Sequence, residues 1–410
     1  MRHSWHLLLI WTVVLVAYSN SFHAGMVFDN ADVIGQDPRI RNVTSDNIRQ
    51  IFQGEYWHNT SGSGLYRPLT TLSYLLNFTI FGNRFNPAGY HWINLCIHCV
   101  NIGIVYALGM LLLERPRMAF MISLIWGVHP LLTESVTNIV GRADLLAALG
   151  VFGGLLCYIK ATQGRGYRAF LWLVLAALAQ AIGAFAKESA LILPAVVLLY
   201  DMTISGSVAW RTRLLRYAAF VPPIAGYFYL RSEIGLHLTV DFADNPLVAA
   251  GFWTAKLTAF KVIGKIMGLV IWPQHLSGDY SYNAVPMFGR SSTPWENAMA
   301  IVSLAACVAA IGLAVRCRRS YRVLSFFLSF FLLALVPTSN LFVLIGSMMG
   351  ERFAYVPSLP LIGCIVVAFD GVVGVCEPSL QRFGLCRGVC RLCGVSCISG
   401  ANSFAESRLA

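Results

Sequence analysis

Residues 90–132 read YHWINLCIHCVNIGIVYALGMLLLERPRMAFMISLIWGVHPLL, in which two apolar runs flank the basic link Arg115–Pro116–Arg117. The two runs, 90–113 and 118–132, contain no Asp, Glu, Lys or Arg. A helix needs about 20 apolar residues to cross the hydrocarbon core of a bilayer. This stretch therefore predicts membrane-embedded helices joined by a short polar turn.

The same pattern recurs along the chain. Of the 410 residues, 57% are hydrophobic and 12% are charged, whereas roughly a quarter are charged in soluble domains. We therefore predict an all-α polytopic membrane protein with about 10–11 apolar segments, several of them short enough to require tilted or broken helices. The expected segments are 5–18, 90–113, 118–132, 144–160, 170–186, 190–200, 215–230, 298–315, 323–337 and 353–375, with 252–272 as a further candidate.

Short basic links give the predicted orientation. They are Arg115/Arg117, Lys160/Arg165/Arg168, Arg211/Arg213/Arg216 and Arg316/Arg318/Arg319/Arg322. The positive-inside rule places such links in the cytoplasm. The formal charge of +11 is scattered over these clusters and forms no basic stripe, which argues against nucleic acid as a partner. If 252–272 crossed the membrane, the number of crossings between residues 217 and 315 would be odd and the last basic link would lie outside. The segment also carries three lysines, so we predict that it is re-entrant or interfacial.

The chain divides into four predicted regions. Residues 1–18 are apolar with no clear cleavage site, so we expect an uncleaved first span or signal anchor; a removed signal peptide is the alternative. Residues 19–89 form a large extracytoplasmic loop with interfacial helices, and 90–375 form the multi-span membrane domain. Residues 376–410 are an atypical Cys-rich tail whose cysteine spacing does not match a zinc site.

The orientation gathers charged residues on the non-cytoplasmic face. Ionisable groups at membrane borders are costly and commonly functional. The candidates for substrate or donor-phosphate binding are Arg67, Glu134, Arg142, Asp144, Lys187, Glu188, Asp279, Tyr280 and Arg352, and Asp29 with Asn30 follows the first apolar segment. An outward recess of acids, cations and aromatics suits a lipid-phosphate substrate whose tail lies in the bilayer.

Several of these candidates have a simpler interpretation. Arg67 precedes Pro68, which predicts a helix start, and it could merely anchor to headgroups. Glu134, Asn138 and Arg142 fall on one stripe of a predicted helix, where a Glu–Arg network could merely brace it.

The remaining candidates have structural alternatives as well. Lys187–Glu188 could be a solvated turn, and Glu351–Arg352 a simple ion pair. The aromatics beside Asp279 could sit at headgroup level or line a sugar subsite. No Gly-rich phosphate loop, His-rich zinc pattern or serine-nucleophile elbow is present, which disfavours nucleotide hydrolysis, zinc proteolysis and lipase chemistry.

Six runs together resemble a known family. They are VFDN (27–30), YRPLT (66–70), HPLLTESVTNIVGRAD (129–144), KE (187–188), LSGDYSY (276–282) and ERFAYVPS (351–358). These runs look like the membrane domain of the transmembrane and TPR-containing (TMTC) O-mannosyltransferases and their bacterial relatives. The resemblance covers roughly residues 5–370. No 34-residue TPR period is found in the sequence, so we expect the membrane domain without the repeats.

The resemblance implies a GT-C glycosyltransferase architecture. The implied reaction moves a sugar, often mannose, from a polyprenyl-phosphate donor to an acceptor hydroxyl, as of protein Ser/Thr, on the extracytoplasmic face. Asp29 matches the first position of the family's catalytic acid pair, and the second position is Asn30 here. A divalent metal is a possible cofactor. The implied location is a bacterial inner membrane or, in a eukaryote, the endoplasmic reticulum membrane.

A second hypothesis is non-enzymatic. Asn30 and the missing repeats favour a lipid-phosphate-binding membrane protein or transporter that retains the fold without the chemistry. Transport predicts ionisable residues near span centres, and few occur there.

Overall fold

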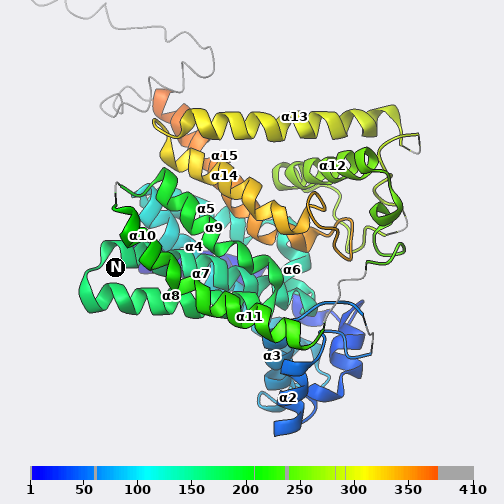
Figure 1. The fold of residues 1–410 in the computed structure, drawn as a ribbon. Helices are drawn as coiled ribbons and strands as arrows, with labels where there is room; N and C mark the ends of the chain where they lie inside the picture. Colours follow the sequence, from blue (N-terminus) through cyan, green and yellow to red (C-terminus); the bar gives the residue numbers. More distant parts are fainter. Residues whose placement is uncertain are drawn as a thin grey trace, which may run out of the picture. The chain divides into compact units, whose positions relative to one another are not determined.

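The computed structural model describes residues 2–59, 62–206, 208–235, 240–281, 283–290 and 292–376 (Figure 1). Within these ranges every regular element is helical, which confirms the all-α prediction. The chain separates into a unit of residues 1–363 and a second unit of 364–410. The predicted Cys-rich tail lies outside the described residues, apart from Cys376 at the end of the last helix.

Among the described residues, five helices are long and apolar enough to cross a membrane, and a sixth candidate is a bent pair of shorter helices. The five contain α4 (Pro87–Leu113), α7 (Arg142–Gln163), α8 (Gly166–Ala186), α13 (Pro294–Cys317) and the start of α15 (Tyr355–Cys376). The bent pair joins α5 (Pro116–Gly127) to the segment Pro130–Thr137 at 53°. This bent pair falls where the sequence predicts the short segment 118–132, and it is either a broken span or a re-entrant loop. The membrane crossings expected elsewhere stay predictions.

The remaining α-helices are α1 (Arg2–Ala17), α2 (Ser45–Gln53), α3 (Pro68–Thr79), α6 (Thr133–Thr137), α9 (Leu193–Thr203), α10 (Trp210–Tyr217), α11 (Val221–Glu233), α12 (Phe252–Ile271) and α14 (Arg322–Leu335). α12 is a continuous helix that packs along α13, and it is not among the five span candidates. Its re-entrant or interfacial placement remains a prediction.

Helix starts follow local sequence signals. Proline stands in the first turn of α3, α4, α5 and α13, where its fixed φ suits the helix and its missing N–H is not needed. The expected helix start at Pro68 is confirmed. Thr293 and Glu296 form a reciprocal capping box at the start of α13, which satisfies two N–H groups that otherwise lack intrahelical partners.

Helices α7 and α8 pack side by side with α4 and α11 as neighbours (Figure 1). Their close approach depends on two glycines. A Cβ added at Gly150 would lie 2.5 Å from Gly183 Cα and 2.7 Å from the Ala179 carbonyl oxygen. Small residues at such positions allow helix backbones to meet in a bilayer, where packing rather than hydrophobicity drives association.

The first loop packs against the helices through a buried apolar cluster that includes Tyr90, Ile139 and Val140. Ile34, Ile51, Tyr74 and Phe78 belong to the same cluster, against which Met26 packs. Arg39 fastens the loop, because its guanidinium binds Asp37 at 2.8 Å and donates to the carbonyl oxygens of Glu55 and Tyr56. On α3, Leu76 and Ile80 are exposed, as an interfacial helix would require; that placement stays a prediction.

The contact between α7 and α8 predicts the effect of one methyl group. We expect Gly150→Ala to destabilise the protein by about 1–3 kcal/mol, because the new Cβ forces the two backbones apart. Gly312→Ala on α13 is the matched control, since a Cβ there meets nothing within 4 Å. Thermal unfolding in detergent measures both variants. Equal midpoints for the two would contradict the close-packing argument.

Candidate active site

Arg352 lies at the centre of the site, in the short 3-10 helix Glu351–Ala354 that leads into α15. Its Nη1 lies 3.3 Å from Asp29 Oδ2, and its Nε lies 3.7 Å from Glu134 Oε1. Its backbone N–H donates to Glu134 Oε2 at 2.7 Å. Side chains from the first loop, from α6 and from the start of α15 therefore meet at one guanidinium.

A tight turn aims Asp29 and Asn30 in opposite directions. Phe28 adopts a φ of 52°, a left-handed conformation that non-glycine residues rarely adopt. The Asp29 side chain is 37% exposed beside Arg352. Asn30 is fully buried, and its Oδ1 accepts a hydrogen bond from the Val140 N–H at 3.0 Å. Asp29 is thus accessible, whereas Asn30 fastens the first loop to the start of α7.

Two tight ion pairs lie beside this group. Lys187 Nζ contacts Asp144 Oδ1 at 2.6 Å, and both side chains are buried. Arg67 grips Glu188 with two hydrogen bonds of 2.7 and 3.1 Å. The simpler interpretation of Lys187–Glu188 as a solvated turn is wrong, because both side chains are paired across the fold.

Charge and burial shift the ionisation of these groups. Burial would raise the pKa of Glu188, but the adjacent Arg67 guanidinium outweighs it and lowers this pKa to about 2. Burial lowers the pKa of Lys187, and the charge of Asp144 partly offsets that effect. At neutral pH the Arg67–Glu188 pair is therefore fully ionised.

Arg142 lies apart from this group. It is fully buried, and its guanidinium donates to Asn94 Oδ1 at 2.7 Å and to the Tyr90 carbonyl at 3.1 Å, with the Tyr74 ring 5.0 Å away. Its predicted contact with a substrate phosphate finds no support in this position.

The expected helical stripe through Glu134, Asn138 and Arg142 is wrong. Asn138 is extended, with a ψ of 128°, and it separates α6 from the Ile139–Gly141 turn. Glu134 pairs with Arg352 and not with Arg142, so the predicted Glu–Arg brace is also wrong.

The Asp279 side chain makes its hydrogen bonds within its own loop. Its carboxylate accepts from the Ser281 N–H at 2.8 Å and from the Ser281 hydroxyl at 2.6 Å. Tyr280 instead reaches Glu351, whose Oε1 accepts from the Tyr280 hydroxyl at 2.7 Å and from the Ser277 N–H at 2.6 Å. The simple Glu351–Arg352 ion pair is therefore wrong, because Glu351 holds the 276–281 loop.

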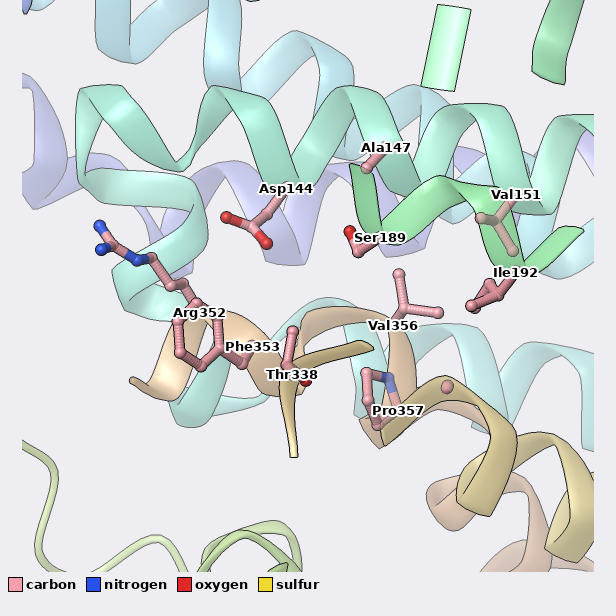
Figure 2. Close-up of a pocket in the computed structure, with 11 residues that line it drawn as sticks. Asp144, Ala147, Val151, Ser189, Ile192, Thr338, Arg352, Phe353, Val356 and Pro357 are labelled. Atoms are coloured by element: carbon pink, nitrogen blue, oxygen red, sulfur yellow. The ribbon is translucent and has the colours of Figure 1, made fainter. Parts of the chain in front are cut away.

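A narrow pocket extends from Arg352 into the helix bundle. Its cavity volume is about 20 Å³, roughly the space of one water molecule. Figure 2 shows Asp144 and Arg352 at one end and the apolar side chains Val151, Ile192 and Val356 at the other. The pocket therefore has a charged end beside Arg352 and an apolar end beyond it.

Some residues at the site carry no strong sequence signal. Phe353 has Lys187 Nζ 5.1 Å and Arg352 Cζ 5.8 Å from its ring centre, within cation–π range. Thr338 and Ser189 line the pocket. Only the adjacency of Phe353 to Arg352, and of Ser189 to Glu188, could have indicated them. In the described ranges no group of three or more His, Cys, Asp or Glu side chains could hold a metal ion.

The fold and the site define a polytopic helical membrane protein with an ion-paired recess at one end of its helices. The chain is 25% identical to human protein O-mannosyl-transferase TMTC4 over 415 aligned residues, covering 89% of this chain and 55% of the relative. It is 29% identical to human TMTC2, covering 69% and 36%, and 30% identical to Tmtc2 of Drosophila melanogaster, covering 70% and 31%.

Over most of its length the chain is similar to the TMTC protein O-mannosyl-transferases. It spans about a third to a half of the length of these curated relatives. No family model matches the chain, and no solved structure matches it.

The Arg67–Glu188 pair predicts how stability changes in acid. Because the folded pKa of Glu188, about 2, lies below its usual 4.5, the pair stabilises the fold fully above pH 4.5. That stabilisation is lost as the pH falls through the folded pKa. We expect Glu188→Gln to show a flatter loss of thermal stability over this window than the wild type. Glu233→Gln removes an exposed carboxylate and is the control; identical acid profiles for Glu188→Gln and the wild type would contradict the assignment.

Proposed function

We propose that this chain is a membrane glycosyltransferase that moves mannose from a polyprenyl-phosphate donor to a Ser or Thr hydroxyl of a protein on the extracytoplasmic face. The observation that carries the proposal is the exposed Asp29 carboxylate beside the weakly held Arg352, at the mouth of a pocket with a polar and an apolar end. The named activity of the curated relatives supports the reaction class.

Asp29 is the proposed general base. Its partly exposed carboxylate takes the proton of the acceptor hydroxyl. The hydroxyl oxygen then forms a bond to the anomeric carbon as the bond between that carbon and the phosphate oxygen breaks. The electron pair leaves with the polyprenyl phosphate, so the anomeric configuration inverts. A positioned base of this kind contributes about 10²–10⁴-fold in rate.

Distances select Arg352 as the phosphate ligand. Lys187 and Arg67 are held by acids at 2.6 and 2.7 Å, whereas Arg352 lies 3.3 and 3.7 Å from its two partners. Arg352 can therefore bind an anion while giving up weaker contacts than Lys187 or Arg67 would lose. Its planar fork suits phosphate, and it stabilises the second negative charge that develops on the leaving phosphate.

Donor binding and release of the base are coupled in this arrangement. A donor phosphate that recruits Arg352 loosens the contact between this guanidinium and Asp29. The apolar end of the pocket, which includes Val151 and Ile192, supports contact with the first part of the lipid tail.

The second candidate function is a non-catalytic lipid-phosphate-binding protein, and Asn30 is the observation that favours it. Asn30 is buried and its Oδ1 serves the Val140 N–H, so Asp29 has no second acid beside it at position 30. Binding of the donor without transfer to any hydroxyl would decide for this candidate.

The relatives also suggest which membrane the chain occupies and which side of it the site faces. We infer that residues 19–89 and the ion-paired recess face the lumen of the endoplasmic reticulum, because the relatives described above are animal proteins. The span 1–18 is proposed as an uncleaved anchor.

Replacing the proposed base tests the reaction. We expect Asp29→Asn to lower sugar transfer from a polyprenyl-phosphate mannose donor by about 10²–10⁴-fold, while donor binding is kept because Arg352 is freed. Asp32→Asn, an exposed acid of the same loop, is the matched control and keeps wild-type transfer. Undiminished transfer by Asp29→Asn would show that Asp29 is not the base.

Replacing the proposed phosphate ligand tests the donor. We expect Arg352→Gln to weaken binding of the lipid-phosphate sugar about 10-fold or more, since a charge-assisted bidentate contact is lost. Arg49→Gln on α2 removes an exposed cation that contacts Gln53 and serves as the control. Equilibrium binding of a fluorescent polyprenyl-phosphate sugar in nanodiscs measures both, and unchanged affinity for Arg352→Gln would rule out this role.

A further inference from the structure

A second cavity lies on the other side of the Arg352–Glu134 contact. It is an open cleft with a cavity volume of about 300 Å³. Its walls are formed by residues 24–30, 133–138 and 276–278, together with Glu351. Glu134 faces this cleft, whereas Arg352 faces the narrow pocket, so their ion pair separates the two cavities.

Charge distinguishes the two cavities. Among the described residues that line the cleft, two are carboxylates, Glu134 and Glu351, and none is Lys or Arg. The narrow pocket instead contains both Arg352 and Asp144. The two carboxylates of the cleft disfavour an anionic phosphate, so a neutral or cationic molecule suits the cleft.

The first wall of the cleft has the character of a free strand edge. Ala24 is extended, with a ψ of 137°, and its carbonyl oxygen accepts from His91 Nε2 at 3.0 Å. Gly25 is exposed, Met26 packs inward and Val27 is 52% exposed, which is the alternation of an extended segment. Within the described ranges the backbone N–H and C=O groups of Gly25 and Met26 make no hydrogen bond.

The far wall places this edge next to the chemistry. Gly278 lies close to Phe28, since a Cβ added there would be 3.5 Å from the Phe28 ring. Phe28 directly precedes Asp29. Glu351 clamps the Ser277 N–H and the Tyr280 hydroxyl, and so holds this wall in place.

We propose that the cleft binds the acceptor as an extended polypeptide whose main chain pairs with the free backbone groups of Gly25 and Met26, and that its Ser or Thr hydroxyl then reaches Asp29. The Val27 carbonyl oxygen is not available, because it accepts from the Asn30 N–H at 3.2 Å. Strand addition of this kind supplies affinity through backbone hydrogen bonds and leaves side-chain sequence largely free. The role of the bound peptide as an acceptor rests on the proposed function, whereas its binding site does not.

The test measures peptide binding without transfer. The full chain in nanodiscs is titrated with a fluorescent ten-residue peptide containing Ser and Thr and no acidic residue. We expect Gly25→Trp to weaken binding at least tenfold, because the indole fills the cleft. The protein tolerates a side chain here, since a Cβ at Gly25 meets nothing within 4 Å. Gly35→Trp is the matched control: it lies in the same loop, outside the cleft, and its Cβ also meets nothing within 4 Å.

Two further peptides examine the proposed contacts. A peptide with N-methylated backbone amides is expected to bind at least tenfold more weakly, because it cannot pair with the free edge. A peptide with Asp flanking the Ser is expected to bind more weakly than one with Lys, because the cleft is acidic.

The outcomes separate this proposal from the proposed function. Loss of binding in Gly25→Trp, with binding kept in Gly35→Trp, supports the cleft even if no sugar is transferred. Absence of peptide binding to the wild type, equal affinity of Gly25→Trp and wild type, or equal affinity of the N-methylated peptide would overturn it, whatever the transfer assay shows.

Discussion

The contact of Arg352 with Glu134 and Asp29 is the interaction on which the site depends. It joins residues separated by more than two hundred positions, because the Arg352 backbone and side chain both bind Glu134 while the guanidinium reaches Asp29. It holds the Asp29 turn against the residues that lead into α15. Arg352 lines the narrow pocket and Glu134 lines the open cleft, so the same contact lies between the two cavities.

A membrane domain cannot leave polar groups unpaired, and this constraint sorts the charged residues into two kinds. Arg142 and Lys187 are buried and held at 2.7 and 2.6 Å by Asn94 and Asp144, so their charges are used to fix helices in place. Arg352 is 27% exposed and held more loosely. Because a buried charge that loses its partner is costly, the tightly paired cations are poor candidates for substrate exchange, and the loosely paired one is a good candidate.

The sequence predicted features that depend on a few neighbouring residues, and it failed for features that depend on contacts between distant segments. Local signals were reliable: the apolar runs are helices, and Pro68 begins one. The stripe through Glu134 and Arg142 failed because helical periodicity was extended across Asn138, where the backbone is extended. Partners were the least predictable feature. Glu351 was expected to pair with its neighbour Arg352, but its carboxylate binds Ser277 and Tyr280, which only the folding of a distant loop brings within reach.

The sequence by itself determined the class of the protein, because hydropathy and the spacing of basic links depend only on composition along the chain. It also predicted which charged residues lie on the outward side, Asp29 and Arg352 among them. Only the tertiary structure decided which of these are accessible, since burial and pairing arise from contacts between distant segments. Asp29 and Asn30 are adjacent in sequence, yet the left-handed turn at Phe28 exposes one and buries the other. That difference is what leaves Asp29 beside Arg352, directly after Phe28 in the wall of the cleft.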